Sequence, residues 1–301
     1  MMETLATWYL SLAPSSPPGY WRESKALERA QMEYDDEVSG GFLKWFPSLS
    51  LAGKDVLDLG CGYGGRTVRY AELGARSVTG IEPGERQCAE GREFAAIHQV
   101  AASFRSGVGE CMPLAADCFD CIVCYDVLEH VSDPGKTLEE CLRVLRAGGS
   151  LYAIFPPFYH PTGAHFEGWL SKMPWPNVLF SCPALVKAGT RILIGRGDSY
   201  RPNAMRPADK LWGLNGITIR KLRQIAHGLD ADFQIRLAPL FSPQNRKWES
   251  WRMKYFAPVF AILRRTPIAQ ECFTHRIILT MTKPHVDALG NTPLRMARRK
   301  G

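Results

Sequence analysis

The sequence predicts an α/β protein built on a doubly wound, mostly parallel sheet, and three observations support this fold class. Short apolar runs alternate with helical segments from Lys54 to Phe155, which is the pattern of parallel strands covered by helices on both faces. The first run ends in a glycine-rich turn at 60–65 that leads into a helical segment. Two more strand-like runs follow near the carboxyl terminus. Sheets of this class bind ligands at the carboxyl ends of their strands.

Each element of the alternating region has its own signal. β-Branched and aromatic residues predict strands, and apolar residues three or four apart predict helices. The expected strands are 54–59, 77–82, 103–108, 119–125 and 150–155, and the expected helices are 66–73, 84–97 and 134–146. Asp133 is expected to cap the last helix, which has Pro134 in its first turn and is stopped by Gly148 and Gly149.

The rest of the chain falls on either side of this region. The predicted parts are a helical cap at 1–50, a core at 51–156, an inserted lid at 157–215, a completion of the sheet at 216–285 and a basic tail at 286–301. The cap is helical over 20–46, with a break at Gly40 and Gly41. The lid is too apolar for a linker and too rich in proline for another sheet layer.

The completing segment is expected to bring the sheet to seven strands. It contains predicted helices at 218–228 and 246–265 and predicted strands at 232–238 and 273–281. Because a long connection precedes these two strands, we expect them to form an antiparallel pair on an otherwise parallel sheet.

Composition limits the classes of protein to consider. Hydrophobic residues are 46% of the 301 residues and charged residues 22%, which favours a packed core. No apolar run approaches the roughly 18 residues of a membrane span, and the amino terminus lacks the positive region of a signal peptide. Nine cysteines, an odd number, fit a reducing cytoplasm better than a set of disulfides. The net charge of +7, partly in the tail, does not argue for a nucleic-acid partner.

The glycine-rich turn indicates a nucleotide-type ligand. Glycines in the 60–65 turn allow the backbone to adopt positive φ angles and to approach a ligand closely. Glu82 ends the next strand, 20 residues beyond Gly62, where a carboxylate can accept hydrogen bonds from both hydroxyls of a ribose. On these residues alone, a nicotinamide-dependent dehydrogenase and a transferase with a nucleoside cofactor are equally compatible.

Four later segments separate these alternatives: GECMPL at 109–114, FD at 119–120, VLEHV at 127–131 and LRAGG at 145–149. Together with LDLGCGYGG at 57–65, they resemble the class I S-adenosylmethionine-dependent methyltransferases, in the branch that includes the ubiquinone-biosynthesis O-methyltransferases. The resemblance covers about residues 50–156. It implies the Rossmann-like methyltransferase fold and S-adenosylmethionine as the cofactor.

The resemblance also implies roles for individual residues. Around the methionine part of the cofactor it places Asp58, Gly60, Gly62 and Gly64, with Tyr125 and Asp126 beneath this part and the transferred methyl. On the nucleoside it places Glu82 at the ribose, Pro83 near the adenine, and Gly109, Glu110 and Met112 along the adenine side. The chain departs from the branch at Val108, where an Asp often binds the adenine amino group, so adenine contact is left to backbone groups or Glu110.

A hydroxyl acceptor needs a base, and three histidines are candidates. His130 lies just past the fourth strand, and His160 and His165 open the inserted lid. The same histidines together with Glu129 are also of the types that bind metals. Since nothing in their spacing forms a tight metal motif, we predict no metal site.

The acceptor is expected to bind under the lid. Aromatic residues at 155–160, followed by Trp169, Trp175 and Phe180, form an apolar cover near the expected methyl. The apolar runs 174–180 and 255–263, the second followed by Arg264 and Arg265, suit peripheral contact with a membrane. The predicted function is therefore methyl transfer to a small-molecule or lipid-like acceptor, at oxygen before nitrogen or carbon, in a cytoplasmic or membrane-peripheral enzyme.

Two rival readings remain at this point. One is a non-catalytic protein that keeps the fold and holds the cofactor as a structural ligand, and the other is an NAD-linked oxidoreductase that uses the same glycine turn. The sequence indicates neither the identity of the acceptor nor the oligomeric state.

Overall fold

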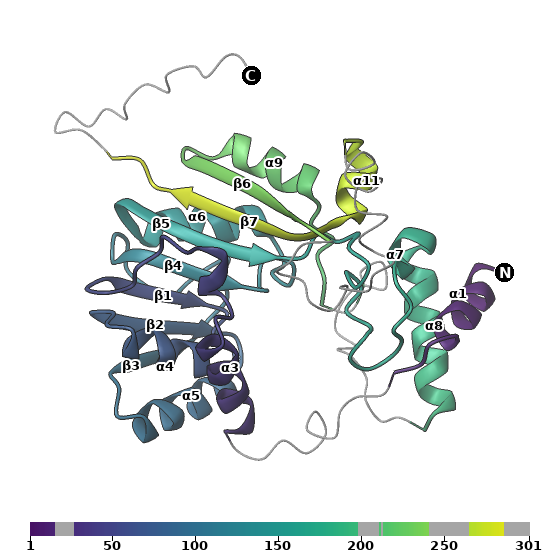
Figure 1. Ribbon diagram of the computed structural model, residues 1–301, viewed down its shortest axis with the longest axis horizontal. Helices are drawn as coiled ribbons and strands as arrows, with labels where there is room; N and C mark the ends of the chain where they lie inside the picture. The colour runs from purple at the N-terminus through teal and green to yellow at the C-terminus, as the bar shows by residue number, and fades with distance from the viewer. Residues whose placement is uncertain (16–26, 198–210, 212, 241–264, 286–301) are drawn as a thin grey trace.

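The computed structural model describes residues 1–15, 27–197, 211, 213–240 and 265–285. In this part of the chain a seven-stranded sheet has the order β3-β2-β1-β4-β5-β7-β6 (Figure 1). The strands are β1 (Asp55–Leu59), β2 (Ser77–Glu82), β3 (Ala102–Ser106), β4 (Phe119–Tyr125), β5 (Leu145–Phe155), β6 (Asp232–Pro239) and β7 (Thr274–Thr282). Strands β1 to β5 pair in parallel, and β7 runs antiparallel to both β5 and β6. The predicted doubly wound, mostly parallel sheet is confirmed.

Helices cover both faces of this sheet. On one face, α6 (Pro134–Val144) and α9 (Ile219–Gly228) contribute Leu138 and Leu222 to the largest apolar cluster. On the other, α4 (Gly65–Glu72), α5 (Glu85–Ile97) and α3 (Glu28–Val38) form smaller clusters with β1, β2 and β3. A short 3-10 turn, η1 (Leu43–Trp45), places Trp45 in the same layer. This burial on both faces explains why the strands are continuous apolar runs.

The predicted elements of the core agree closely with these bounds. Asp133 caps α6, since its side chain accepts hydrogen bonds from the backbone N–H groups of Gly135 and Lys136. Leu145 begins β5, so the strand starts before the glycine pair at 148–149, which was expected to end the helix. The predicted helix at 246–265 lies outside the described residues except for its last position.

A second body of structure stands beyond the carboxyl ends of the strands. It contains α1 (Met2–Ser11), α7 (Pro176–Leu179) and α8 (Cys182–Gly195), seen to the right of the sheet in Figure 1. Leu10 of α1 is fully buried in a cluster with Leu185 and Leu193 of α8. The sequence analysis predicted neither α1 nor α8, and it assigned the first 50 residues to one cap. Instead α1 packs with the insertion, while α3 packs with α4.

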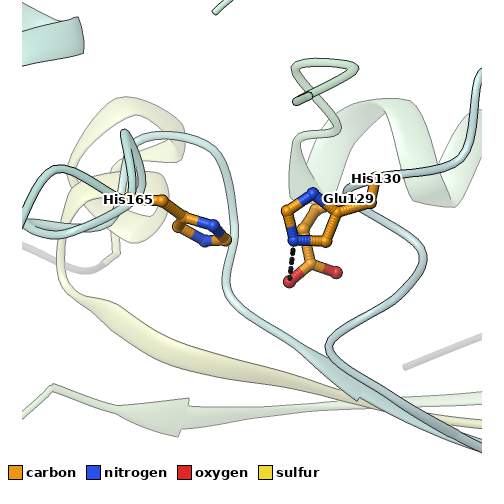
Figure 2. Close-up of side chains that lie close together, drawn as sticks. All are labelled: Glu129, His130 and His165. Atoms are coloured by element: carbon orange, nitrogen blue, oxygen red, sulfur yellow. Dashed lines mark ion pairs between the residues drawn. The ribbon is translucent and has the colours of Figure 1, made fainter. Parts of the chain in front are cut away.

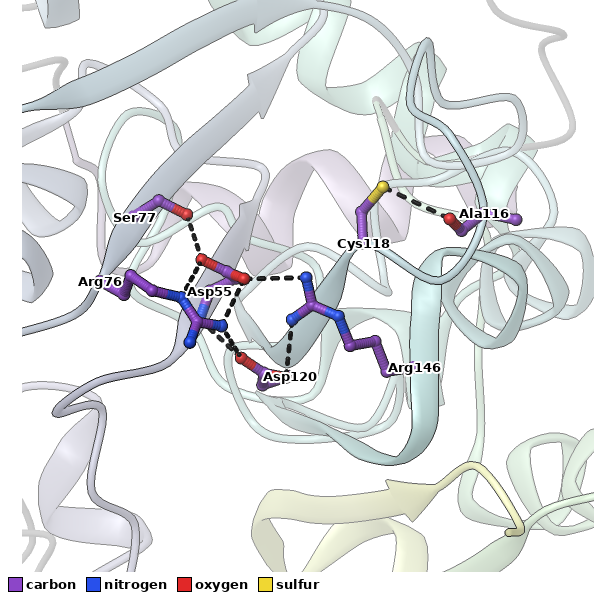
Figure 3. A network of polar contacts seen from close by, with 7 residues as sticks. All are labelled: Asp55, Arg76, Ser77, Ala116, Cys118, Asp120 and Arg146. Atoms are coloured by element: carbon purple, nitrogen blue, oxygen red, sulfur yellow. Dashed lines mark hydrogen bonds and ion pairs between the residues drawn. The ribbon is translucent and has the colours of Figure 1, made fainter. Parts of the chain in front are cut away.

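The amino ends of the central strands are joined by a network of charges (Figure 3). Arg76 lies 2.6 Å from Asp55 and 2.9 Å from Asp120, and Arg146 pairs with the same two carboxylates at 2.8 and 2.7 Å. The hydrogen bonds from Arg76 are the largest cause of a pKa at Asp55 well below its ordinary value. The network ties β1, β4 and β5 to the segment that enters β2.

In the described residues, every helix is too short or too polar to cross a membrane.

Candidate active site

The glycine-rich turn is built as the sequence predicted. The backbone N–H groups of Gly60 and Cys61 both donate to the carbonyl of Ile81, at 2.8 and 3.1 Å. Gly60 has a φ of +72°, and a Cβ there would lie 2.3 Å from a methyl of Val127. Only glycine therefore fits between the end of β1 and the segment that follows β4.

Glu82 lies at the end of β2 with its carboxylate turned toward this turn. One oxygen accepts a hydrogen bond from the N–H of Gly62 at 3.3 Å. Burial is the largest cause of a raised pKa at Glu82. The exposed Pro83 follows it directly. Since a carboxylate has more lone pairs than these contacts use, Glu82 fits the ribose-binding position.

Asp58 is buried beneath the turn. Its carboxylate accepts a hydrogen bond of 2.6 Å from the hydroxyl of Thr67 on α4, and only 4% of the residue is exposed. Burial raises the pKa of Asp58 to about 6. Through this hydrogen bond, Asp58 also holds α4 on the sheet.

Two residues missed by the sequence analysis complete the turn. Glu33 of α3 accepts hydrogen bonds from the N–H groups of Tyr63 and Gly65, both at 3.1 Å. Burial raises the pKa of Glu33 to about 7. Arg66, the second residue of α4, stacks its guanidinium 4.6 Å from the ring centre of Tyr125. The position of Arg66 directly after the glycines could have marked it as a residue of the site. Nothing in the sequence linked Glu33 to a turn 30 residues away.

These residues fit the methionine-bearing cofactor that the motifs imply. The buried Nε of Arg66 has no hydrogen-bond partner among the described residues, so it offers a donor to a carboxylate. Glu82 offers acceptors to a ribose, and Asp126 adds a carboxylate at the end of β4. A zwitterionic amino acid joined to a nucleoside needs donors and acceptors of this kind.

The adenine side departs from the prediction. The carboxylate of Glu110 accepts hydrogen bonds from the N–H groups of Ser132 and Asp133, so it holds the entry to α6. Met112 is 4% exposed and belongs to the main core, and its place beside the adenine stays a prediction. Gly109 has Thr137 at 2.9 Å from the place of a Cβ. Val108, at the position where the branch often has an Asp, is 45% exposed, and Cys111 is exposed too.

Tyr125 and Asp126 stand between two arginines. Asp126 has a φ of +56° and forms an ion pair with Arg276 of β7. The guanidinium of Arg276 is 6.0 Å from the ring centre of Tyr125, farther than that of Arg66. A left-handed aspartate costs conformational energy and is often found at functional sites.

His130 and His165 come together as candidates for proton transfer, and Figure 2 shows them with Glu129. Their ring centres lie 5.1 Å apart. The Nδ1 of His130 is 3.0 Å from the carbonyl of Gly213, so Nδ1 carries the proton and the lone pair of the neutral ring is on Nε2. Burial is the main cause that lowers the pKa of His165 to about 3.

His160 stands apart from this pair. Its Nδ1 accepts from the backbone N–H of Thr162 at 3.2 Å, and its Nε2 lies 3.2 Å from Nδ1 of His275. The side chain is 4% exposed, and burial lowers the pKa of His160 to about 2. Because both ring nitrogens are engaged inside the protein, we do not assign His160 as the base.

Glu129 is the most unusual side chain at this edge. It is 3% exposed, and neither carboxylate oxygen has a hydrogen-bond partner within the described ranges. Burial raises the pKa of Glu129 well above its ordinary value. Together with His165, it lines a small pocket whose other walls are apolar, with Phe158 and Leu214 from the insertion and Ile217 from the segment that follows it.

Asn215, also missed by the sequence analysis, holds the segment that carries Glu129 and His130. Its side-chain amide donates to the carbonyls of Leu128 and Val131, at 2.7 and 2.8 Å. Its backbone N–H donates to the carbonyl of Glu129 at 2.9 Å. The end of the insertion is therefore bonded directly to the loop after β4.

Comparisons with known proteins agree with this geometry. A family described as "methyltransferase domain" matches residues 57–153. The ubiquinone biosynthesis O-methyltransferase of Pseudomonas aeruginosa (strain LESB58) is 40% identical over 103 residues, which are 34% of this chain and 44% of that protein. The protein of the same name from Stutzerimonas stutzeri is 35% identical over 105 residues, 35% and 45% of the two chains. The matched region thus spans less than half the length of these relatives.

Among solved structures, the chain is similar to an S-adenosylmethionine-dependent methyltransferase from Mesorhizobium loti. The sequences are 16% identical, the TM-score is 0.48, and the alignment covers 79% of this chain and 95% of the other. The family match includes the glycine-rich turn, Glu82 and the VLEHV segment. Residues 57–153 are therefore similar to the family described as a methyltransferase domain, and the match covers about a third of the chain.

Proposed function

We propose that the protein transfers a methyl group from S-adenosylmethionine to the oxygen of a small-molecule or lipid-like acceptor. The observation that carries this proposal is the position of the apolar pocket. It opens beside Glu129 and His165, three residues along the chain from Asp126, where the motifs set the methyl. The curated relatives are named as O-methyltransferases, which supports oxygen as the acceptor atom.

The chain's own residues divide the work. When bound, S-adenosylmethionine supplies a methyl group on a sulfonium that already contains its leaving group. Glu82 and the glycine turn bind and orient the cofactor, while Phe158 and Leu214 exclude water from the acceptor side. The Nε2 lone pair of His130 is well placed to take a hydroxyl proton, since Nδ1 is held on the Gly213 carbonyl.

Cofactor binding is tested by calorimetry with S-adenosylhomocysteine, the demethylated product. We expect stoichiometric binding that weakens at least tenfold in Glu82→Gln, because an amide accepts fewer hydrogen bonds than a carboxylate. Glu93→Gln, an exposed change on α5, is the matched control. Failure of the folded wild-type protein to bind would overturn the proposal.

Acceptor chemistry is tested with labelled methyl donor and separate aqueous and lipid extracts. We expect a labelled product whose mass spectrum places the methyl on oxygen. Label found only on nitrogen or carbon would contradict O-methylation. Cofactor binding without any labelled product would favour a non-catalytic protein.

A further inference from the structure

Three side chains of metal-binding type converge at the carboxyl edge of the sheet: Glu129, His130 and His165 (Figure 2). One ligand atom from each lies within 4.8 Å of the other two. We propose that this cluster binds a divalent transition-metal ion of the zinc type and leaves one coordination position open to the pocket. The use of that position by the acceptor rests on the proposed function; metal binding itself does not.

The first support is the unpartnered carboxylate of Glu129. A buried carboxyl group without a hydrogen bond is costly in either protonation state, because the neutral form also needs an acceptor for its O–H. Within the described residues neither oxygen of Glu129 has such a partner. Figure 2 shows this carboxylate turned toward the ring of His130, whose Nε2 lies 3.9 Å from Oε1.

The second support is the orientation of His130. Histidines that bind metals commonly donate the other ring N–H to a carbonyl or carboxylate, which fixes the ring and its tautomer. Here Nδ1 of His130 meets the carbonyl of Gly213 at 3.0 Å. In the neutral ring Nε2 therefore carries the lone pair, and it lies 3.9 Å from Oε1 of Glu129. One cation between these two atoms would have both as ligands.

The third support is the backbone at His165. Its φ of +55° is unfavourable for a residue with a Cβ. The strained turn is held by hydrogen bonds from His165 N–H to the carbonyl of Thr162, at 2.8 Å, and from the indole of Trp169 to the carbonyl of His165, at 2.6 Å. The insertion thus fixes an imidazole opposite the loop after β4.

The charges around the cluster also suit a cation. Asp126 and Arg276 form an ion pair beside it and cancel each other. Glu129, once it loses its proton to a bound metal ion, would add one negative charge to the cluster and partly neutralise a divalent ion. Two neutral imidazoles and one carboxylate match the ligand set of catalytic zinc sites, which keep a fourth position for water or substrate.

The ligand types select the metal. Imidazole nitrogens favour zinc and its transition-metal neighbours, whereas magnesium and calcium prefer oxygen ligands. Zinc to ligand distances of about 2.0–2.2 Å place tetrahedral ligands roughly 3.4 Å apart. Ligand atoms at the 4.8 Å limit therefore need to approach by roughly 1.4 Å. No metal site was predicted from the sequence, because the spacing of these residues forms no tight metal motif.

A metal at this place would change how the acceptor ionises. A hydroxyl on the fourth position loses its proton to bulk water more readily, because the cation stabilises the resulting oxyanion. Nε2 of His130 is then a ligand and does not act as the base. The oxyanion would then use a lone pair to form the bond to the methyl carbon, while the carbon–sulfur bond of the sulfonium breaks and its electron pair goes to sulfur, which leaves the neutral thioether.

The test measures metal binding directly, on tag-free protein treated with EDTA and then freed of it. Zn²⁺ is titrated in competition with a chromophoric chelator, and Co²⁺ provides an absorption spectrum that reports ligand geometry. We expect one ion per chain and tetrahedral cobalt bands. His165→Ala and Glu129→Gln should each weaken Zn²⁺ binding by at least tenfold, while His227→Ala, an exposed histidine on α9, should not.

Two more readouts separate this proposal from its neighbours. Without metal, Glu129→Gln should melt at the same or a higher temperature than wild type, and it should lose the rise in melting temperature that Zn²⁺ gives. Both His165→Ala and Glu129→Gln should still bind S-adenosylhomocysteine, which tests the cofactor site independently. Absence of Zn²⁺ binding, or equal affinity in wild type and all three variants, would overturn the proposal.

Discussion

The two edges of the sheet differ in how their carboxylates are paired. At the amino edge, Asp55 and Asp120 are each paired with Arg76 and Arg146. At the carboxyl edge, the carboxylate of Glu129 is buried without a hydrogen-bond partner among the described residues. Around the glycine turn, burial raises acidic pKa values, whereas hydrogen bonds at the amino edge lower that of Asp55.

This difference separates stability from function within one sheet. Paired charges at the amino edge stabilise the fold modestly, and their partners lie within the protein. Unpaired groups and left-handed residues at the carboxyl edge cost free energy, which a ligand can recover. Changes at the amino edge should therefore alter stability alone, and changes at the carboxyl edge should alter binding as well.

Gly60→Ala should have the largest effect. The added Cβ meets Val127 and stands on a residue with positive φ, so we expect a loss of about 4 kcal/mol in unfolding free energy from strain and overpacking together. Denaturant unfolding measures this loss. Calorimetry should also show at least tenfold weaker binding of S-adenosylhomocysteine.

Two matched variants separate the conformational part of that loss in unfolding free energy from the overpacking part. Gly53→Ala has a similar φ of +71° with no atom within 4 Å of the new Cβ, so it should show only the conformational part, about 1–2 kcal/mol. Val127→Ala in the Gly60→Ala background should recover the overpacking part. If Gly53→Ala is as damaging as Gly60→Ala, the contact with Val127 is not the cause.

Glu33→Gln should change the pH dependence of stability. Burial raises the pKa of Glu33 to about 7 in the folded protein, so the folded state holds its proton where the unfolded chain has lost it. Stability from this group should therefore fall as pH rises from about 4.5 to about 7, by about 3 kcal/mol. The difference between wild type and Glu33→Gln, measured by denaturant unfolding across this range, isolates the group.

The reverse sign is expected at the amino edge, where the pKa of Asp55 is lowered. Its contribution should be complete above about pH 4 and be lost as pH falls further.

A wild type minus Glu33→Gln difference that is flat between pH 4 and 8 would show that the carboxylate of Glu33 is not destabilised by burial.

Arg146→Met should have the smallest effect. It removes one of two cations from the amino-edge network, in which its side chain is 38% exposed, so we expect a loss of about 1 kcal/mol that shrinks in high salt. S-Adenosylhomocysteine affinity should stay within twofold of wild type. A larger drop in affinity would show that the two edges are coupled.

Elements that depend on local sequence were predicted, and elements that depend on packing between distant segments were not. Strands β1 to β5 and the cap at Asp133 were predicted because each depends on residues adjacent in the chain. Helices α1 and α8 were missed, although Pro183 in the first turn of α8 was a usable signal. Their stability comes from packing on each other, which no local pattern records.

The site divides in the same way. The glycine turn and Glu82 were found because their spacing along the chain is fixed by one strand, one helix and the next strand. Glu33 and Asn215 were not found, because their contacts join segments far apart in sequence. His160 and His165 looked alike in sequence, yet the left-handed turn at His165 sends one toward His130 and leaves the other on His275.

Asn215 donates three hydrogen bonds to the loop after β4, and these bonds have a consequence for ligand binding. They join the end of the insertion to the carbonyls of Leu128, Glu129 and Val131. Any ligand that orders this loop must then favour the docked insertion, and docking must strengthen that ligand's binding by the same factor, because such coupling is reciprocal. If the protein methylates an acceptor as proposed, binding and release of that acceptor would be coupled to docking of the insertion through Asn215.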